Sequence, residues 1–275
     1  MRAGLAVLAY LAALFLSQPS FAELRVVVMD VGQGQAVLLR RGSRGILIDS
    51  GLAPFADKLL QRIAAQGVDS LDYLILSHLH PDHAGGYFRI RERYPEAVVI
   101  VNGHPLAARN QPFIVNLYDD ALRGDPRRRV MRAGDELLWR GVTIKALWPA
   151  FFAGQNLNRH SLVLAISYGD SRALIMGDAG GYVERWLVDQ GAVQGPVSLL
   201  VSGHHGMAGS ADPNFLAMVH PRVAVISASW QVPAYLPDDA VVARLGATSG
   251  RLLRTDDDGE ICLELSRDSD MAQDC

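Results

Sequence analysis

Short runs of β-branched and other apolar residues recur from residue 24 to residue 265, separated by polar turns and by stretches with helical spacing. Neither a repeat nor a low-complexity linker interrupts this pattern, so we expect one domain after residue 22. The apolar runs predict strands at Leu24–Met29, Ala36–Arg40, Gly45–Ile48, Leu71–Leu76, Ala97–Val101, Val142–Leu147, Leu162–Tyr168, Arg172–Met176, Ser198–Ser202, Val223–Ser227, Arg251–Arg254 and Ile261–Leu265.

Helical spacing of apolar residues occurs between some of the predicted strands. Phe55–Gln66 has this spacing, and the segments Asn214–Val219 and Asp239–Leu245 follow the helix-start signals Asp212-Pro213 and Pro237-Asp238. Some predicted strands therefore follow one another directly, whereas helices separate others. This arrangement favours an α/β (α+β) class with two mixed sheets that carry helices on their outer faces.

The first 22 residues have the pattern of a signal peptide. Arg2 precedes an apolar run from Leu5 to Leu16, and Ser20 and Ala22 supply the small residues of a cleavage site. The apolar run is shorter than the ~20 residues that span a bilayer, although an uncleaved anchor helix stays an open alternative. We expect residues 1–22 to be removed and residues 23–275 to be exported, either to the periplasm or out of the cell.

Composition narrows the class of protein. Apolar residues make up 49% of the 275 residues and charged residues 20%, which excludes a disordered chain. The net charge of −3 excludes a general nucleic-acid coat protein, so any contact with nucleic acid has to be local. Cys262 and Cys275 are too few for a disulfide scaffold, and a bridge between them stays open. The charged segment Ser266–Asp274 predicts a frayed end.

The strongest chemical signal follows the predicted strand Leu71–Leu76. Three histidines and one aspartate occupy six positions there, namely His78, His80, Asp82 and His83. Alternate residues of an extended turn point the same way, so the first two histidines can converge on one ion while the other two residues serve a neighbouring position. Imidazole and carboxylate are ligands for Zn²⁺, Mn²⁺ or Fe. The alternative, a histidine-rich surface loop, fits poorly with a position directly after a core strand.

Two further groups follow apolar runs. The pair His204-His205 comes soon after Leu199–Val201, and a pair is less common in a core than a lone histidine, which favours a ligand. Asp178 closely follows the run Leu174–Met176, where an ordinary turn aspartate stays an open alternative.

The segment from His78 to His83 resembles the His-x-His-x-Asp-His signature of the metallo-β-lactamase superfamily. The segments Gly45–Gly51, Leu174–Asp178 and Ser202–Gly206 resemble its other elements, in the expected order. The resemblance implies a four-layer αββα fold and two divalent metal ions, zinc or manganese. It implies that His78 and His80 bind the first ion, that Asp82, His83 and His204 bind the second, that Asp178 bridges both, and that Asp49 orients a ligand.

A narrower resemblance covers residues 24–265. The runs Asp30–Gly34, Asn158–Leu164 and His204–Gly206 are similar to the hydrolase domain of ComEC-type competence proteins, a family that imports transforming DNA. This resemblance implies an exported, free-standing relative of that domain, connected with competence and DNA uptake. It implies a nuclease, with DNA or another phosphodiester as substrate.

The chain departs from the family pattern around the expected metal site. His80 stands where ComEC-type domains commonly have an acidic residue, and Gln35 replaces an aspartate. Met207 replaces a serine, and Leu236 replaces a histidine before proline. These changes surround the expected ligands and leave them intact, so they bear on the substrate more than on the capacity for hydrolysis.

The third histidine of the superfamily's first metal site is not clearly present. Asn156 or Asn158 occupies the corresponding stretch, as in ComEC-type chains. His160 is displaced toward the next strand, and we interpret it as a histidine at the edge of a loop, with a ligand role left open.

The expected reaction is hydrolysis assisted by two metal ions, which activate water and stabilise the attacking and leaving oxygens of a phosphodiester. Asp82 is expected to hold or relay the proton of the attacking water, and His205 to donate a hydrogen bond or proton to the oxyanion. Two alternatives stay open. One is a hydrolase of a small lactone, lactam or thioester with a dry apolar pocket, and the other is a non-catalytic DNA-binding module of the same fold.

Two groups of basic residues could bind phosphate near such a site. Their alternative interpretation is a solvated helix face and a solvated loop. The members are Arg89, Arg91 and Arg93 in the first group and Arg123, Arg127, Arg128, Arg129 and Arg132 in the second.

Overall fold

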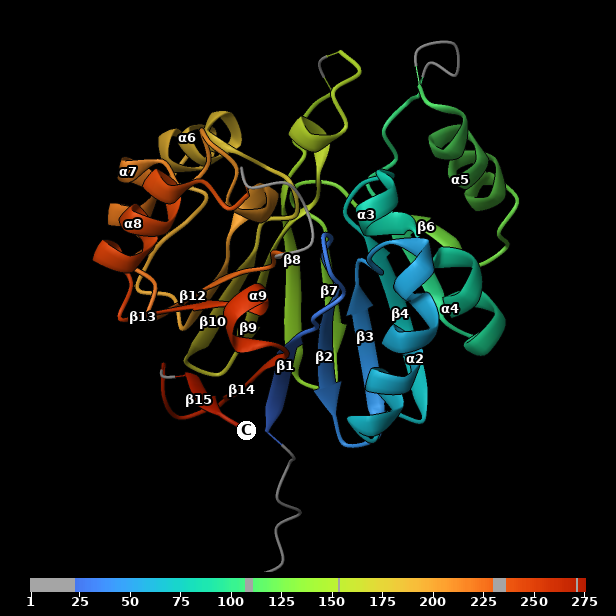
Figure 1. The fold of residues 1–275 in the computed structure, drawn as a ribbon, viewed down its shortest axis with the longest axis horizontal. Helices are drawn as coiled ribbons and strands as arrows, with labels where there is room; N and C mark the ends of the chain where they lie inside the picture. The colour runs from blue at the N-terminus through green and yellow to red at the C-terminus, as the bar shows by residue number, and fades with distance from the viewer. Residues whose placement is uncertain (1–22, 107–110, 153, 230–235, 271) are drawn as a thin grey trace, which may run out of the picture.

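The computed structural model describes residues 23–106, 111–152, 154–229, 236–270 and 272–275. The predicted signal peptide, residues 1–22, lies outside the described residues. Two mixed sheets face each other, and helices cover both outer faces (Figure 1). The expected four-layer αββα architecture is confirmed. Within the described residues, no helix combines the length and the apolar character that a membrane span requires.

The first sheet has eight strands in the order β15-β14-β1-β2-β3-β4-β5-β6. The pairs from β1 to β3 are antiparallel, and those from β3 to β6 are parallel. The bounds are β1 Leu24–Val28, β2 Val37–Arg41, β3 Arg44–Ile48, β4 Ser70–Leu76, β5 Val98–Val101, β6 Arg128–Val130, β14 Ile261–Leu265 and β15 Ala272–Asp274.

The second sheet repeats this scheme with seven strands in the order β13-β12-β11-β10-β9-β8-β7. The pairs from β7 to β10 are antiparallel and those from β10 to β13 are parallel. The bounds are β7 Glu136–Trp139, β8 Val142–Trp148, β9 Val163–Tyr168, β10 Ser171–Ile175, β11 Leu199–Val201, β12 Val223–Ile226 and β13 Arg251–Arg254.

Helices pack on the outer face of each sheet through apolar residues that recur at helical spacing. On the first sheet, Leu59 and Ile63 of α2 join a buried cluster with strand residues such as Leu74. On the second sheet, Leu187 of α6 and Phe215 of α7 do the same. The bounds are α2 Ala56–Ala65, α3 Pro81–Ala84, α4 Tyr87–Arg93, α5 Phe113–Arg123, α6 Gly181–Asp189, α7 Pro213–Val219, α8 Asp239–Thr248 and α9 Thr255–Asp258.

The parallel part of each sheet brings several loops to one edge of the molecule. Asp49 follows β3, and Ser77 follows β4 in the first sheet, while Asp178 and Ser202 come after β10 and β11 in the second. Because parallel strands end at the same edge of a sheet, residues that follow them lie side by side, and ligands commonly bind there. This edge lies at the top of Figure 1, where α3 begins.

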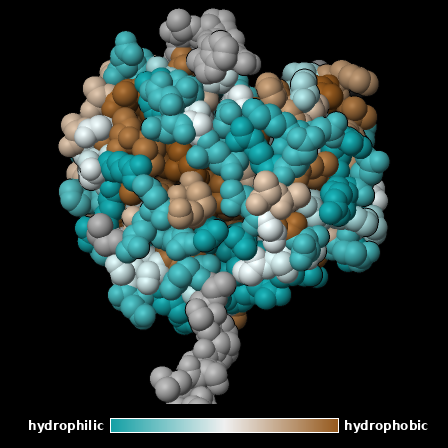
Figure 2. All heavy atoms as spheres, turned by 60° about the horizontal axis from the view of Figure 1, so that its bottom comes forward, coloured by the Kyte–Doolittle hydropathy of each residue, from teal (hydrophilic) through white to brown (hydrophobic). Residues whose placement is uncertain are grey.

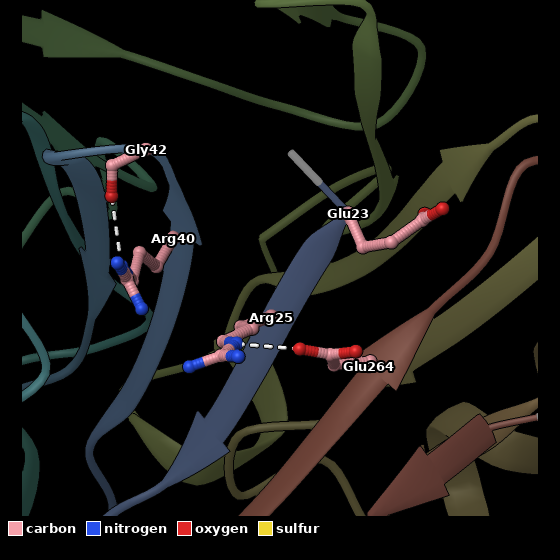
Figure 3. Close-up of a pocket in the computed structure, with 5 residues that line it drawn as sticks. All are labelled: Glu23, Arg25, Arg40, Gly42 and Glu264. Carbon is pink, nitrogen blue, oxygen red and sulfur yellow. Dashed lines mark hydrogen bonds and ion pairs between the residues drawn. The ribbon is translucent and has the colours of Figure 1, made fainter. Parts of the chain in front are cut away.

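The opposite edge carries a pocket of about 240 Å³ beside the β2–β3 turn. Figure 3 shows Arg25 donating to Glu264 Oε1 over 2.7 Å, and Arg40 donating to the carbonyl oxygen of Gly42 over the same distance. This pocket contains no histidine. Gly42 precedes β3 and Asp49 follows it, so the pocket and the histidine-rich segment lie at opposite ends of the strands.

Mostly hydrophilic residues, with smaller hydrophobic areas between them, cover the face turned forward in Figure 2.

The C-terminal end differs from the prediction. Ala272–Asp274 forms β15, which pairs antiparallel with β14, and Cys262 forms a disulfide with Cys275 over a Cα–Cα distance of 5.5 Å. The prediction of a frayed end was therefore wrong for these residues. The polar composition indicated solvation, but backbone pairing and a covalent bond fix this segment in spite of its charge.

Candidate metal centre

The histidine-rich segment turns from strand to helix directly after β4. His78 follows the strand and is almost fully buried, and His80 is the N-cap of α3. Pro81 is the first residue of this short helix, where proline supplies a helical φ and its missing N–H costs no hydrogen bond. The single turn then carries Asp82 and His83, so all four side chains of the motif lie at one edge of the first sheet.

Two groups of possible metal ligands meet at this edge. The ligand atoms within each group all lie within 4.8 Å of one another, and Asp178 belongs to both groups. It therefore lies between the two positions, as expected of a bridging carboxylate. The first group consists of His78, His80 and Asp178, and the second of Asp82, His83, Asp178 and His205.

The two oxygens of Asp178 face different histidines. Oδ1 lies 2.9 Å from His83 Nε2 and 3.5 Å from His205 Nε2. Oδ2 lies 3.6 Å from His78 Nε2 and 3.7 Å from His204 Nε2. Asp178 comes from the second sheet and the His78–His83 segment from the first, so the centre forms only when the two sheets pack.

The donor atoms suit divalent ions. His78 Nε2 and His205 Nε2 are buried and make no hydrogen bond. Two ligands of one tetrahedral ion, each about 2.1 Å from it, lie about 3.4 Å apart. The separations of these nitrogens from Asp178, 3.6 and 3.5 Å, are close to that value. Imidazole and carboxylate on a buried polar site therefore fit a pair of ions better than they fit mutual hydrogen bonding.

Asp49 acts on the centre through His83. Its Oδ2 lies 2.8 Å from His83 Nδ1, which leaves Nε2 of that ring turned toward Asp178. The same carboxylate accepts hydrogen bonds from the backbone N–H and hydroxyl of Ser77 and from the side-chain amide of Gln35. A carboxylate on the far nitrogen of a ligating histidine fixes the ring and its tautomer, so Asp49 lies where the sequence analysis expected an orienting residue.

Gln35 contacts both Asp49 and the ligand loop, and the sequence pattern did not predict these contacts. Its backbone N–H donates to the carbonyl oxygen of Asp82 over 3.0 Å, in addition to the side-chain bond to Asp49. The preceding Gly34 has φ +149°, and a Cβ there would lie 2.5 Å from the same carbonyl oxygen. The glycine-rich run therefore brings its backbone into direct contact with the ligand loop, and its role is structural.

The two histidines of the pair lie differently from the expectation relative to the groups of possible ligands. His205, expected as a proton donor, lies in the group with Asp82 and His83, and its Nδ1 is 2.9 Å from the carbonyl oxygen of Ser227. His204, expected as a ligand of that group, is not part of it. Both residues have positive φ angles, 52° and 53°, so the backbone coils here and sends the two rings in directions that strand alternation does not predict.

The comparisons with known proteins agree with this geometry. The sequence profile of the metallo-beta-lactamase superfamily matches residues 29–230. The chain belongs to the metallo-β-lactamase superfamily. The expectation of a metal-dependent hydrolase of this superfamily is thereby confirmed.

Two curated relatives are similar over most of the chain. Competence protein ComA of Neisseria gonorrhoeae is 32% identical over 91% of this chain, and Recombination protein 2 of Haemophilus influenzae is 29% identical over 96%. The chain spans about a third of the length of these relatives, 34% and 32%. Among solved structures, CmlA, a diiron β-hydroxylase from Streptomyces venezuelae, superposes with a TM-score of 0.62 at 18% identity, over 90% of this chain and 55% of that one, which shows the shared fold.

The superfamily's third histidine of the first site has no counterpart in that group. Asn158, in the 3₁₀ turn Asn158–His160, has its Nδ2 3.0 Å from His204 Nε2. His160 is fully buried, and its ring packs at a tilt against that of His104, with centroids 4.3 Å apart. Burial and the charges of His104 and Arg159 lower the pKa of His160 to about 4. His160 is thus a buried histidine at the end of the turn before β9, and it belongs to neither group of possible ligands.

The pKa values of the histidines shift in opposite directions in the two groups of possible ligands. Burial, together with the neighbouring His83, holds the pKa of His78 well below its ordinary value. Burial acts in the same direction on His83, but Asp178 and Asp49 outweigh it and raise its pKa well above the ordinary value. Burial likewise lowers the pKa of His205, but Asp178 raises it by more, so that this pKa also lies above its ordinary value. Because a ligating nitrogen carries no proton, metal binding at the second group has to release protons.

Four of the eight arginines in the two basic groups pair with acids. Arg89 pairs with Asp57, Arg91 with Asp125 over 2.8 Å, and Arg127 pairs with Glu96. Arg123 pairs with Asp119, which lies one turn before it on the same helix, α5. These arginines connect surface elements to one another, as the alternative of a solvated face implied, and they offer little charge to a substrate.

Proposed function

We propose that the protein is an exported, binuclear metal-dependent phosphodiesterase that cleaves DNA. The observation that carries the proposal is the position of Asp178, whose two oxygens face the two groups of ligands separately. Two ions held by these groups would suit a phosphodiester, because they would supply positive charge opposite both the attacking and the leaving oxygen.

The names of the relatives support DNA as the substrate. They are a competence protein and a recombination protein, and the chain aligns with about a third of each. A lactone or lactam hydrolase finds less support, because no described feature of the site favours a small neutral substrate over a phosphodiester.

Each ligand group has residues with a definite task. His78, His80 and Asp178 would hold one ion, and Asp82, His83, Asp178 and His205 the other. Bound there, divalent ions supply a lower pKa for coordinated water and positive charge opposite the phosphate. Asp49 orients His83 through its Nδ1.

Asp82 is placed to take up the proton of the attacking water. Burial raises the pKa of this carboxyl group, but the nearby imidazole of His205 and the charge of His83 outweigh burial and keep the pKa well below its usual range. The carboxylate is therefore ionised at neutral pH, and its Oδ2 lies 3.5 Å from His205 Nε2. His204, which contacts Asn158 and has a partly exposed side chain, is placed to donate a hydrogen bond to the substrate, the task first expected of His205.

The disulfide supports export. Cys262 and Cys275 are bonded, and disulfides persist in oxidising compartments such as the bacterial periplasm or the cell exterior. This agrees with the signal-peptide pattern of residues 1–22 and with a function outside the cytoplasm, where DNA from the surroundings is available.

The test is cleavage of single-stranded and double-stranded DNA by the purified protein with Mn²⁺ and with Zn²⁺. The variants Asp82→Ala and His83→Ala are expected to abolish cleavage, whereas Arg251→Gln, at the opposite edge of the second sheet, is expected to leave it unchanged.

Three results would contradict the proposal in different ways. Bound metal without cleavage of either DNA would reject the nuclease and redirect the search to small esters or lactones. Salt-dependent DNA binding without cleavage would favour the non-catalytic binding module. Absence of bound metal would reject the enzyme.

A further inference from the structure

We infer that Arg159, held by the ring of Tyr182, binds a backbone phosphate of a single-stranded nucleic acid next to the metal centre. The inference rests on the proposed function, because it specifies how the same site would take its substrate. It adds a binding residue that lies outside both groups of metal ligands.

Arg159 is fixed at the rim of the centre. It is the middle residue of the turn Asn158–His160, and the preceding Asn158 contacts His204 Nε2 over 3.0 Å. Trp148 Nε1 donates to the carbonyl oxygen of Arg159 over 2.6 Å, and the backbone N–H of Arg159 donates to Asn156 Oδ1 over 2.9 Å. The backbone of Arg159 is thus anchored on both sides, while the residue itself is exposed.

The guanidinium of Arg159 packs on an aromatic ring instead of pairing with an acid. Its Cζ lies 3.9 Å from the ring centroid of Tyr182, the second residue of α6, four positions after Asp178. None of the carboxylates in the described part of the chain forms an ion pair with Arg159. Cation–π stacking uses the face of the guanidinium and leaves its N–H groups at the edge, where they can donate to a phosphate.

This separates Arg159 from arginines that only connect surface elements. The N–H groups of Arg91 donate to Asp125 and to the backbone carbonyl oxygens of Pro95 and Ala97. Arg185, a neighbour of Tyr182 on α6, pairs with Asp212 over 3.0 Å. These two arginines donate to acids or carbonyl oxygens. The guanidinium of Arg159 is held by the ring of Tyr182, and its N–H groups can donate to a phosphate.

A second pair of the same kind lies close to the same turn. Arg132, which is exposed, has its Cζ 5.6 Å from the ring centroid of Phe152. The ring of Phe152 in turn lies 5.3 Å from that of His160, the residue after Arg159. Two guanidinium–aromatic pairs therefore lie at or next to the turn Asn158–His160, and 41% of the surface of Tyr182 is exposed.

Positive charge interleaved with exposed aromatic rings is suited to a single strand. Its phosphates accept hydrogen bonds from arginine, and its unpaired bases can stack on rings, which a duplex does not allow.

The test measures binding without cleavage. A fluorescein-labelled oligodeoxythymidylate with a phosphorothioate backbone is titrated with metal-loaded protein over a range of NaCl concentrations, and anisotropy gives the dissociation constant. Arg159→Gln is expected to weaken binding about tenfold at low salt and to reduce the slope of log K against log [salt] by about 0.7, the value for one phosphate contact on a single strand. Tyr182→Leu and Arg159→Lys are expected to be intermediate, because each removes the stacking but keeps the charge.

The matched control is Arg251→Gln. It removes the same charge from an exposed arginine that pairs with Asp274 over 2.8 Å at the start of β13, at the opposite edge of the sheet. It is expected to leave both the affinity and the salt slope unchanged. Equal effects of Arg159→Gln and Arg251→Gln would overturn the inference, and so would a duplex bound as tightly as the single strand.

A small substrate separates this inference from the proposed function. Hydrolysis of bis(4-nitrophenyl) phosphate by the wild type tests the metal centre by itself, because this small diester offers no second phosphate to a binding residue. Arg159→Gln is expected to raise the KM for an oligonucleotide. Hydrolysis of the small diester with no binding of oligonucleotide would refute the inference but leave the metallohydrolase. Binding that depends on Arg159 without any hydrolysis would support the inference and refute the nuclease.

Discussion

Asp49 Oδ2 and His83 Nδ1 lie 2.8 Å apart, and both side chains are fully buried. Because Asp49 fixes the ring, we expect Asp49→Asn to lower the affinity of the second ion by about 10- to 100-fold. Chelator competition with Zn²⁺ or Co²⁺ would measure it. Glu92→Gln, which changes an exposed carboxylate, is the control. Equal metal affinity in Asp49→Asn and the wild type would show that Asp49 serves only the fold.

The positions of His204 and His205 give a direct test of the ligand groups. His205→Ala is expected to lose one of two ions per chain, because His205 belongs to the group of Asp82 and His83. His204→Ala is expected to retain both ions and to lose rate, because His204 lies outside that group, beside Asn158. Metal content by mass spectrometry decides between them, and the opposite result would restore the assignment expected from the sequence.

The contact of Gly34 with the ligand loop predicts an effect on metal binding. Gly34→Ala would place a Cβ 2.5 Å from the carbonyl oxygen of Asp82, so we expect weaker binding of the second ion and a loss of stability of about 1–3 kcal/mol. Gly42→Ala is the control, because Gly42 also has a positive φ but no atom within 4 Å of the added Cβ. Similar metal affinity in both variants would contradict a role of Gly34 at the site.

The disulfide is expected to stabilise the fold without a part in catalysis. It closes a loop with a sequence separation of 13 residues, for which loop-closure entropy predicts about 3 kcal/mol. The double variant Cys262→Ser with Cys275→Ser should therefore unfold at lower urea concentration, with unchanged metal content. Reductant should lower the stability of the wild type to that of the variant, and a wild type insensitive to reductant under unfolding conditions would argue against the bond.

Glu184 predicts a pH dependence of stability. Burial raises its pKa to about 7, against the opposing hydrogen bonds from the backbone N–H groups of Ala211 and Asp212, which precede α7. A carboxyl pKa that is higher in the folded state than in the unfolded state, 4.5, means that stability is fully present below pH 4.5 and is lost as the pH rises to about 7. The loss amounts to at most about 3 kcal/mol.

Glu184→Gln removes this titration. Urea unfolding of metal-free protein between pH 4.5 and 8 is expected to show the wild type losing stability relative to the variant as the pH rises. A constant difference between the two proteins over this range would mean that Glu184 stays ionised in the fold.

Local sequence determined most of the secondary structure. The twelve expected strands all occur within a few residues of their predicted bounds, because buried strands require continuous apolar runs. The strands β6, β7 and β15 were not predicted. The strands β6 and β15 have only three residues each, and most residues of β7 are not buried. Pairing with a neighbouring strand stabilises all three, and the local sequence carries no signal of that pairing.

The sequence by itself also determined the chemistry, because residues 78–83 carry their ligands within one turn and spacing alone brings those side chains together. Only the tertiary structure decided which histidine of the late pair joins Asp82, since two positive φ angles redirect both rings. Tertiary structure likewise decided that Arg159 meets Tyr182, because these residues belong to different elements. Contacts between distant segments depend on how the sheets and helices pack, and no local pattern encodes that packing.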